Sequence, residues 1–166
     1  LLTRPVENVE VLMEKMLANA LQLVQATGGF VGIYNDEGTS VTLHHGIGMP
    51  KEAIKAPLAA ADGPLKQLHE TGETLFSKDS WWNVVFQKED SRASSVIFIP
   101  LQQGREVKGV LAASWIGEER ALEEEAAEVL RQFADLAVLA FERIQAQEKI
   151  SHMAFFDVLT GLPNRV

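Results

Sequence analysis

The chain has 166 residues, of which 46% are hydrophobic, so it is long enough to bury the core of one domain. Its formal net charge of −8 argues against nucleic acid as a partner, because the phosphates of nucleic acid attract a basic surface. The chain has no cysteine, which excludes disulfides, cysteine-ligated zinc or iron–sulfur centres, cysteine nucleophiles and thioether-attached chromophores.

The first third of the chain predicts a helix and a hairpin. Residues 5–26 carry apolar side chains at steps of three and four, which predicts an amphipathic helix that ends at Gly28 and Gly29. Residues 30–46 contain two runs that are typical of strands. The turn formers at residues 35–38 separate these runs, so the stretch predicts a β-hairpin.

The middle of the chain, residues 50–90, has a mixed pattern. It predicts short helices around Glu52 and over residues 65–69, a short strand at residues 74–77, and a helix or loop over residues 80–90. This segment is irregular and interrupted by glycines, so it is not expected to pack as a solid layer. We therefore expect a void or a ligand between it and the sheet.

The last third predicts a second hairpin and a long helix. In residues 96–99 and 110–113 every position is apolar, including those that point to opposite faces of a strand. These strands are therefore expected to be covered on both faces, in the middle of a sheet. The short turn at residues 102–106 suits an antiparallel pair. The helix over residues 119–152 starts with carboxylates, which the helix dipole favours, and is longer than a domain of this size can cover.

This order of elements predicts an α+β fold. One central antiparallel sheet would have the N- and C-terminal helices on one face and short helices and loops on the other. The layout, together with the strand GVLAAS at residues 109–114, resembles a GAF domain over about residues 6–141. A PAS domain, which is structurally related, is the alternative, but the long first helix and the short-turn closing hairpin favour GAF. We assign residues 1–145 to this GAF-like sensory domain.

The end of the chain resembles the start of another domain. The stretch FFDVLTGLPNR at residues 155–165 is similar to the DxLTGLPNR signature of GGDEF domains, the diguanylate cyclases that condense two GTP into cyclic di-GMP. The resemblance assigns the opening turn of that domain to Asp157, Thr160, Gly161, Asn164 and Arg165. It implies that Asp157 pairs with Arg165, and that residues 146–166 are a linker helix and the start of a GGDEF domain.

The chain begins at Leu1, without a methionine, and ends within this signature, so we expect it to be one module of a longer protein. The GG[DE]EF loop and the metal-binding carboxylates of the family would follow Val166. We therefore expect no enzymatic activity and no cofactor in this chain, whereas the parent protein would bind GTP and magnesium.

In GAF domains, a segment between the two hairpins covers a ligand pocket on one face of the sheet. In this chain the corresponding segment is rich in aromatic residues. The candidate ligand contacts are Trp81, Trp82 and Phe86 from this segment and Tyr34, His45, Phe98 and Ser114 from the strands. The aromatic residues either stack on a flat ligand or cap the core, and strand alternation leaves open which face each residue takes. The ligand is unidentified, because the NKxnFx3DE signature of GAF domains that bind cyclic nucleotides is missing.

The histidines do not predict a metal site. Neighbouring strand residues point to opposite faces, so His44 and His45 are not expected to converge on one ion. His69 and His152 have no ligand partner at the spacing that a helical metal site needs. A redox or gas sensor with a bound metal is kept as an alternative.

The last helix carries two adjacent apolar stripes, each with the alternating steps of a coiled-coil seam. The stripe that we expect to pair with a second copy consists of Leu130, Ala134, Ala137, Phe141 and Ile144. The other stripe would then cover the sheet. A single broad surface that faces the core is the alternative. The sequence thus predicts a parallel homodimer through the first and last helices.

Together these features predict a cytoplasmic sensory module that binds a small ligand, dimerises and controls a downstream diguanylate cyclase. No membrane span or secretory signal is found, so no membrane contact is expected. One alternative is a dimerisation linker without a ligand. Another is a regulator of a degenerate GGDEF domain followed by a phosphodiesterase domain.

Overall fold

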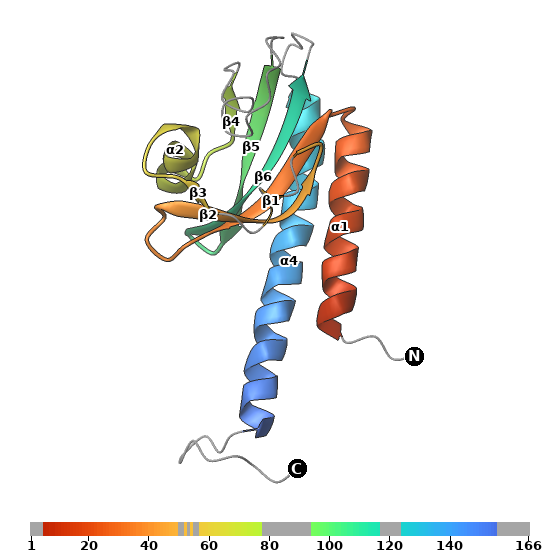
Figure 1. Cartoon of the computed structure of the whole chain (residues 1–166), viewed down its shortest axis with the longest axis vertical. Helices are drawn as coiled ribbons and strands as arrows, with labels where there is room; N and C mark the ends of the chain where they lie inside the picture. The colour runs from red at the N-terminus through yellow and green to blue at the C-terminus, as the bar shows by residue number, and fades with distance from the viewer. Residues whose placement is uncertain are drawn as a thin grey trace.

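The computed structural model describes residues 5–49, 52, 54, 57–77, 94–116 and 124–155. The described helices are α1 (Pro5–Leu23), α2 (Gly63–Thr71) and α4 (Glu124–Phe155). The described strands are β1 (Gly28–Tyr34), β2 (Ser40–Ile47), β3 (Pro57–Ala59), β4 (Leu75–Ser77), β5 (Ser94–Gln103) and β6 (Glu106–Ile116). In Figure 1, α1 and α4 lie along one face of a curled sheet, and α2 lies on the other side.

The six strands form one antiparallel sheet in the order β3-β2-β1-β6-β5-β4. Strands β1 and β2 form one hairpin, and β5 and β6 form the other. The two hairpins are joined by the pairing of β1 with β6, in which Phe30 lies opposite Ala112. Strands β5 and β6 therefore have neighbours on both sides, as their apolar runs predicted. The three-residue strands β3 and β4 take the two edges, where they pair with three residues each of β2 and β5.

Alternate residues of each central strand enter two separate hydrophobic cores. On β5, Ile97, Ile99 and Leu101 pack with α1 and α4, whereas Val96 and Phe98 belong to the core on the side of α2. All five are almost completely buried. The predicted α+β fold, with strands covered on both faces and the terminal helices on one face, is confirmed.

Close packing fixes the end of α1 on the sheet. Trp115 Nε1 on β6 donates a hydrogen bond to the carbonyl of Val24, just after α1, at 3.0 Å. Gly29 on β1 leaves no room for a side chain, because an added Cβ would lie 2.6 Å from Cδ2 of Leu21. Glycine at this position therefore lets α1 lie directly on the strand.

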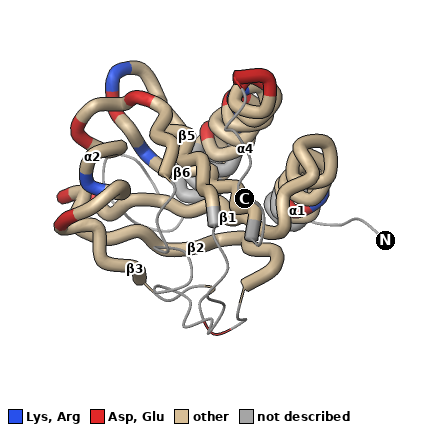
Figure 2. Tube along the Cα trace, turned by 90° about the horizontal axis from the view of Figure 1, so that it is seen from above, with Lys and Arg blue, Asp and Glu red and all other residues tan. Residues whose placement is uncertain are grey.

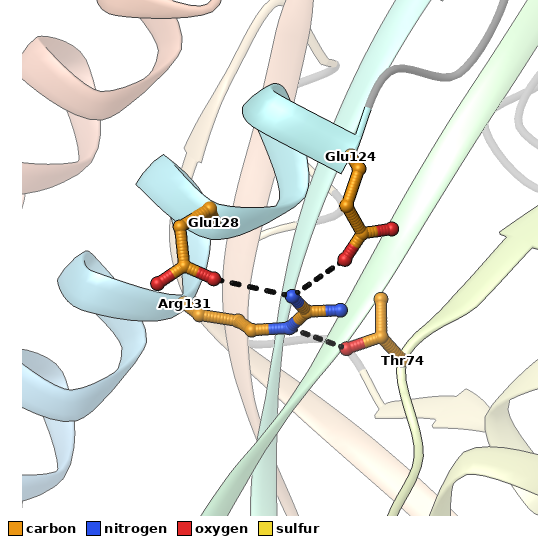
Figure 3. A network of polar contacts seen from close by, with 4 residues as sticks. All are labelled: Thr74, Glu124, Glu128 and Arg131. Atoms are coloured by element: carbon orange, nitrogen blue, oxygen red, sulfur yellow. Dashed lines mark hydrogen bonds and ion pairs between the residues drawn. The ribbon is translucent and has the colours of Figure 1, made fainter.

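Helix α4 lies beside α1 and continues past the N-terminal end of α1 (Figure 1). Its 32 residues span about 48 Å at a rise of about 1.5 Å per residue. Near its start, the guanidinium of Arg131 contacts Glu124 at 3.0 Å and Glu128 at 3.4 Å, and donates to Thr74 Oγ1 at 3.4 Å (Figure 3). Because Thr74 directly precedes β4, this network ties α4 to the edge of the sheet.

The stripe predicted to pair with a second copy faces the core of its own chain instead. Leu130 is fully buried, and Ala134 and Ala137 are nearly so, among residues of α1 and the sheet. Phe141 is partly buried against the same core, and the side chain of Ile144 is not among those described. The other stripe packs against the same core through Ala126, Val129, Phe133 and Ala140, so the two stripes form one broad surface that faces the core, as in the alternative interpretation.

The structure confirms two predicted elements of the middle segment and adds one. Helix α2 corresponds to the predicted helix over residues 65–69, and β4 corresponds to the predicted strand at residues 74–77. Strand β3 was not predicted, because three residues that begin at a proline show no alternation. It pairs with β2, where Leu58 lies opposite Val41.

Three predictions fall largely or wholly outside the described residues. Around the helix predicted at Glu52, only residues 52 and 54 are described. The predicted helix or loop over residues 80–90 and the turn at residues 157–165 are not described. None of the described helices combines the length and the apolar character needed to cross a membrane.

Candidate functional site

The α2 side of the sheet brings two of the predicted ligand contacts together. Phe98 on β5 is fully buried in the core of this side. Ser114 on β6 lies opposite Val96 of the same core, and Phe98 lies opposite Ala112. Phe98 and Ser114 are therefore diagonal neighbours on one face, with Cα atoms roughly 7 Å apart.

The hydroxyl of Ser114 is the most informative polar atom on this face. It is fully buried, and no described residue gives it a hydrogen-bond partner. Leaving a buried hydroxyl without a partner costs about 1 to 3 kcal/mol, which a ligand with one hydrogen-bonding group would offset. The segment with Trp81, Trp82 and Phe86 lies outside the described residues, so its part in the pocket stays a prediction.

His45 lies on the opposite face from Ser114. Its partner across the β1–β2 ladder is Val31, which packs in the core beneath α1 and α4. Directly opposed residues of an antiparallel pair share a face, so His45 points toward the helices. The prediction that His45 joins the pocket with Phe98 and Ser114 is therefore wrong.

A β-bulge explains why alternation misled the prediction for the two histidines. Leu43 pairs with Gly32 and His45 pairs with Val31, so β2 has one extra residue, His44, at this point. The ring of His44 lies 6.3 Å from that of Phe141 on α4, so His44 also lies on the helix side.

Within the described ranges, no three histidine or carboxylate side chains are grouped to hold a metal ion.

Tyr34 shares a face with Ser114 but lies far from it along β1. The residue of β1 opposite Ser114 is Gly28, six residues before Tyr34, so the two sites are roughly 20 Å apart. The hydroxyl of Tyr34 donates a 2.6 Å hydrogen bond to the carbonyl of Leu65, and burial raises the pKa of Tyr34. Tyr34 thus positions α2 and does not contribute to the site around Ser114.

Tyr34 lines a second depression, which we call the hairpin-tip cleft. It is an open cleft of about 500 Å³ that lies between the β1–β2 turn, the β5–β6 turn and α2. Its lining includes Tyr34, Asp36, His69, Arg105, Val107 and Lys108. The rings of Tyr34 and His69 have centroids 4.8 Å apart, and the His69 ring also lies against the backbone of Gly38.

Charged residues of both signs lie on α2 and near it (Figure 2), and those that line the cleft are Asp36, Arg105, Glu106 and Lys108. Lys108 Nζ lies 2.6 Å from Glu106 Oε2, and their hydrogen bond lowers the pKa of Glu106 and raises that of Lys108. The charge of Asp36 adds to the rise in the pKa of Lys108. Neither Asp36 nor Arg105 forms a hydrogen bond or an ion pair with another described residue.

The sequence did not predict this cleft. Both turns were predicted, and each carries charged residues, which is the signal that points to it. However, the two turns come together only because β1 pairs with β6 up to Ile33 opposite Gly109. This pairing joins segments far apart in the chain, and local patterns do not encode it.

A family model described as "GAF domain" matches residues 6–142. No curated protein matches the chain at a significant level. The structure is also similar to solved GAF domains. One is the second GAF domain of DevS from Mycobacterium smegmatis, with 21% identity, a TM-score of 0.68, and coverage of 86% of this chain and 99% of that one.

Two other solved structures show the same likeness. The GAF domain/HD domain protein from Geobacter sulfurreducens has 15% identity and a TM-score of 0.69, with 85% of this chain and 96% of that one covered. The blue-light absorbing form of the Thermosynechococcus elongatus PixJ GAF domain has 16% identity and a TM-score of 0.64, with 89% and 92% covered. At these identities the likeness shows the fold.

Proposed function

The chain belongs to the GAF domain family, and on that premise we propose that it is a sensory module that binds a small ligand and, as a homodimer, controls a diguanylate cyclase. GAF domains are in general ligand-binding signalling modules without catalytic activity of their own. The proposed link to a cyclase rests on the resemblance of residues 157–165 to the start of a GGDEF domain. That domain, and not the GAF module, would bind GTP and magnesium.

The buried hydroxyl of Ser114 is the observation that carries the ligand proposal. It lies among apolar residues, beside Phe98 and across from Val96, on a central strand of the sheet. Small-molecule sites are mostly apolar, with a few polar groups that fix the orientation of the ligand. A small, largely apolar molecule with one hydrogen-bonding group suits this face.

Helix α4 provides the path from the ligand to the cyclase. It packs on β5, which carries Phe98, and on α1. Its last residue, Phe155, comes just before the signature at residues 157–165. A packed helix shifts as a unit, so a movement of β5 on ligand binding would reach the start of the GGDEF domain.

Exposed leucines on both terminal helices mark the surface on which we place a second copy. Leu12 and Leu23 on α1 are 51% and 67% exposed, and Leu136 and Leu139 on α4 are 49% and 60% exposed. We call these four residues the outer leucine face. Exposed apolar clusters of this kind often mark interaction sites. This face replaces the stripe through Leu130 as the proposed seam.

Helical spacing places one leucine of each helix, Leu12 and Leu136, beside the same crevice. Met16 of α1 and Phe133 of α4 line a narrow crevice between the two helices and the sheet. Residues three or four apart are neighbours on a helix surface. Leu12 is four residues before Met16, and Leu136 is three residues after Phe133, so each leucine lies next to a residue that lines the crevice. Two copies that join through these faces would form a four-helix bundle.

The ligand proposal is tested by comparing two serines. Ser95 on β5 is also buried without a described partner, but it lies opposite Trp115 on the helix side. We expect mass spectrometry to detect a small molecule in natively purified protein and in Ser95→Ala, and much less of it in Ser114→Ala. Both substitutions remove an unsatisfied hydroxyl, so neither should lower the stability of the empty protein by more than about 1 kcal/mol.

The same experiment separates the alternatives. Equal amounts of the molecule in Ser114→Ala and Ser95→Ala would contradict a site at Ser114. If the wild-type protein yields no small molecule, the dimerisation linker without a ligand becomes the better account. Hydrolysis of cyclic di-GMP by the full-length protein, without synthesis from GTP, would instead favour a degenerate GGDEF domain followed by a phosphodiesterase domain.

A further inference from the structure

We propose that the hairpin-tip cleft is a second binding site, which takes a small zwitterion of the amino-acid class. The cleft lies at the end of β1 that carries Tyr34, roughly 20 Å along the strand from the position of Ser114. It is therefore separate from the ligand site of the proposed function and does not depend on it.

The charges of the cleft determine the class of ligand. Lys108 and Glu106 form an ion pair at 2.6 Å and largely neutralise each other. This leaves Asp36 on the β1–β2 turn and Arg105 on the β5–β6 turn, each without an ion-pair partner among the described residues. An ammonium group would bind at Asp36, and a carboxylate would bind the planar guanidinium of Arg105. A simple anion or cation would meet a charge of its own sign.

Local structure holds both turns in place before any ligand binds. Asn35 Oδ1 accepts hydrogen bonds from the backbone N–H groups of Thr39 and Ser40, at 2.8 and 3.1 Å. Gly38 and Gly104 have φ of 72° and 66°, which few other residues adopt without strain. A site that is already formed loses less entropy on binding, which favours recognition of a small molecule.

The rest of the lining is suited to an apolar or flat side chain. Val107 and the rings of Tyr34 and His69 line the cleft between the two charged turns. A volume of about 500 Å³ lies within the range of small-molecule sites, which is about 300 to 1,000 Å³. An amino acid with an aromatic side chain therefore matches both the charges and the apolar lining.

Three probes with the same phenyl group test the role of each charge. L-Phenylalanine has both charges, hydrocinnamate has the carboxylate alone, and phenethylamine has the ammonium alone. We expect phenylalanine to shift the backbone amide NMR signals of Asp36 and Arg105 saturably, with a Kd in the millimolar range, and the other two probes to bind at least about tenfold more weakly. Equal binding of all three probes, no saturable binding, or shifts confined to other residues would overturn the proposal.

Matched variants locate the two contacts. Asp36→Asn and Arg105→Gln should each weaken phenylalanine binding by about tenfold. Glu37→Gln, beside Asp36 in the same turn, and Lys66→Gln, on α2, change exposed charges that do not line the cleft and should leave binding unchanged. Equal effects of all four variants would show that binding does not depend on Asp36 and Arg105 in particular, and would refute the site. Ser114→Ala should not affect phenylalanine binding, so the two sites fail or succeed independently.

Discussion

At Tyr34, one buried hydroxyl links a strand to a helix that is distant in the sequence. The side chain is 7% exposed, and its hydroxyl donates a 2.6 Å hydrogen bond to the carbonyl of Leu65 on α2. Its ring also contacts His69 near the end of the same helix. Because α2 covers this part of the sheet, Tyr34 fixes one wall of the hairpin-tip cleft.

Replacing Tyr34 by phenylalanine should lower the free energy of unfolding by about 1 to 2 kcal/mol, because the buried hydrogen bond from the tyrosine hydroxyl to the carbonyl of Leu65 would be lost. Urea unfolding measures this change. Thr71→Val is a suitable control, because the hydroxyl of Thr71 also donates to a carbonyl of α2, that of Gln67, but is exposed to water. The change for Thr71→Val should be under about 0.5 kcal/mol. Equal losses in the two variants would contradict a special role for the buried bond.

At the scale of elements, local periodicity predicted most of the fold but not the details of the site. Helix α1 and strands β5 and β6 were predicted correctly, because their patterns are local. These patterns are the helical repeat of residues 5–26 and the apolar runs of residues 96–99 and 110–113. The bulge at His44 and the long distance between Tyr34 and Ser114 depend on strand register, which only the folded sheet sets. For this reason, Phe98 and Ser114 remain together in the candidate site, whereas His45 and Tyr34 do not.

The Arg131 network shows how one element is held to another. Arg131 joins Glu124 and Glu128 within α4 and reaches Thr74, beside β4 at the sheet edge (Figure 3). Exposed ion pairs contribute about 0 to 1 kcal/mol, so Arg131→Gln should change overall stability little. It should instead loosen the edge locally, seen as faster amide hydrogen exchange in β4 and the first turn of α4.

Lys66→Gln is the control for this prediction. Lys66 pairs with Glu70 at 3.9 Å, and both residues lie on α2. The substitution therefore removes an ion pair that does not connect one element to another. Hydrogen exchange in β4 should therefore stay as in the wild type. Unchanged exchange in β4 of Arg131→Gln would show that the network does not hold the edge of the sheet.

At the scale of the whole molecule, the outer leucine face should hold the homodimer together. Leu136 and Leu139 lie on the outer side of α4, whereas Ala134 of the same helix is buried beneath it at 2% exposure. The double variant Leu136→Glu, Leu139→Glu should therefore shift sedimentation from dimer to monomer, because it places charges in an apolar interface. Its free energy of unfolding as a monomer should change by less than about 1 kcal/mol.

Ala134→Glu is the matched substitution on the inner face of the same helix. It buries an unpaired carboxylate in the core of one chain, so it should destabilise the monomer by several kcal/mol, seen in urea unfolding at a concentration where the wild type is monomeric. The contrast between the two variants distinguishes the outer face of α4 from the inner one. A wild-type protein that stays monomeric at high micromolar concentration would contradict the homodimer. A dimer that withstands both outer substitutions would instead place the interface on another surface.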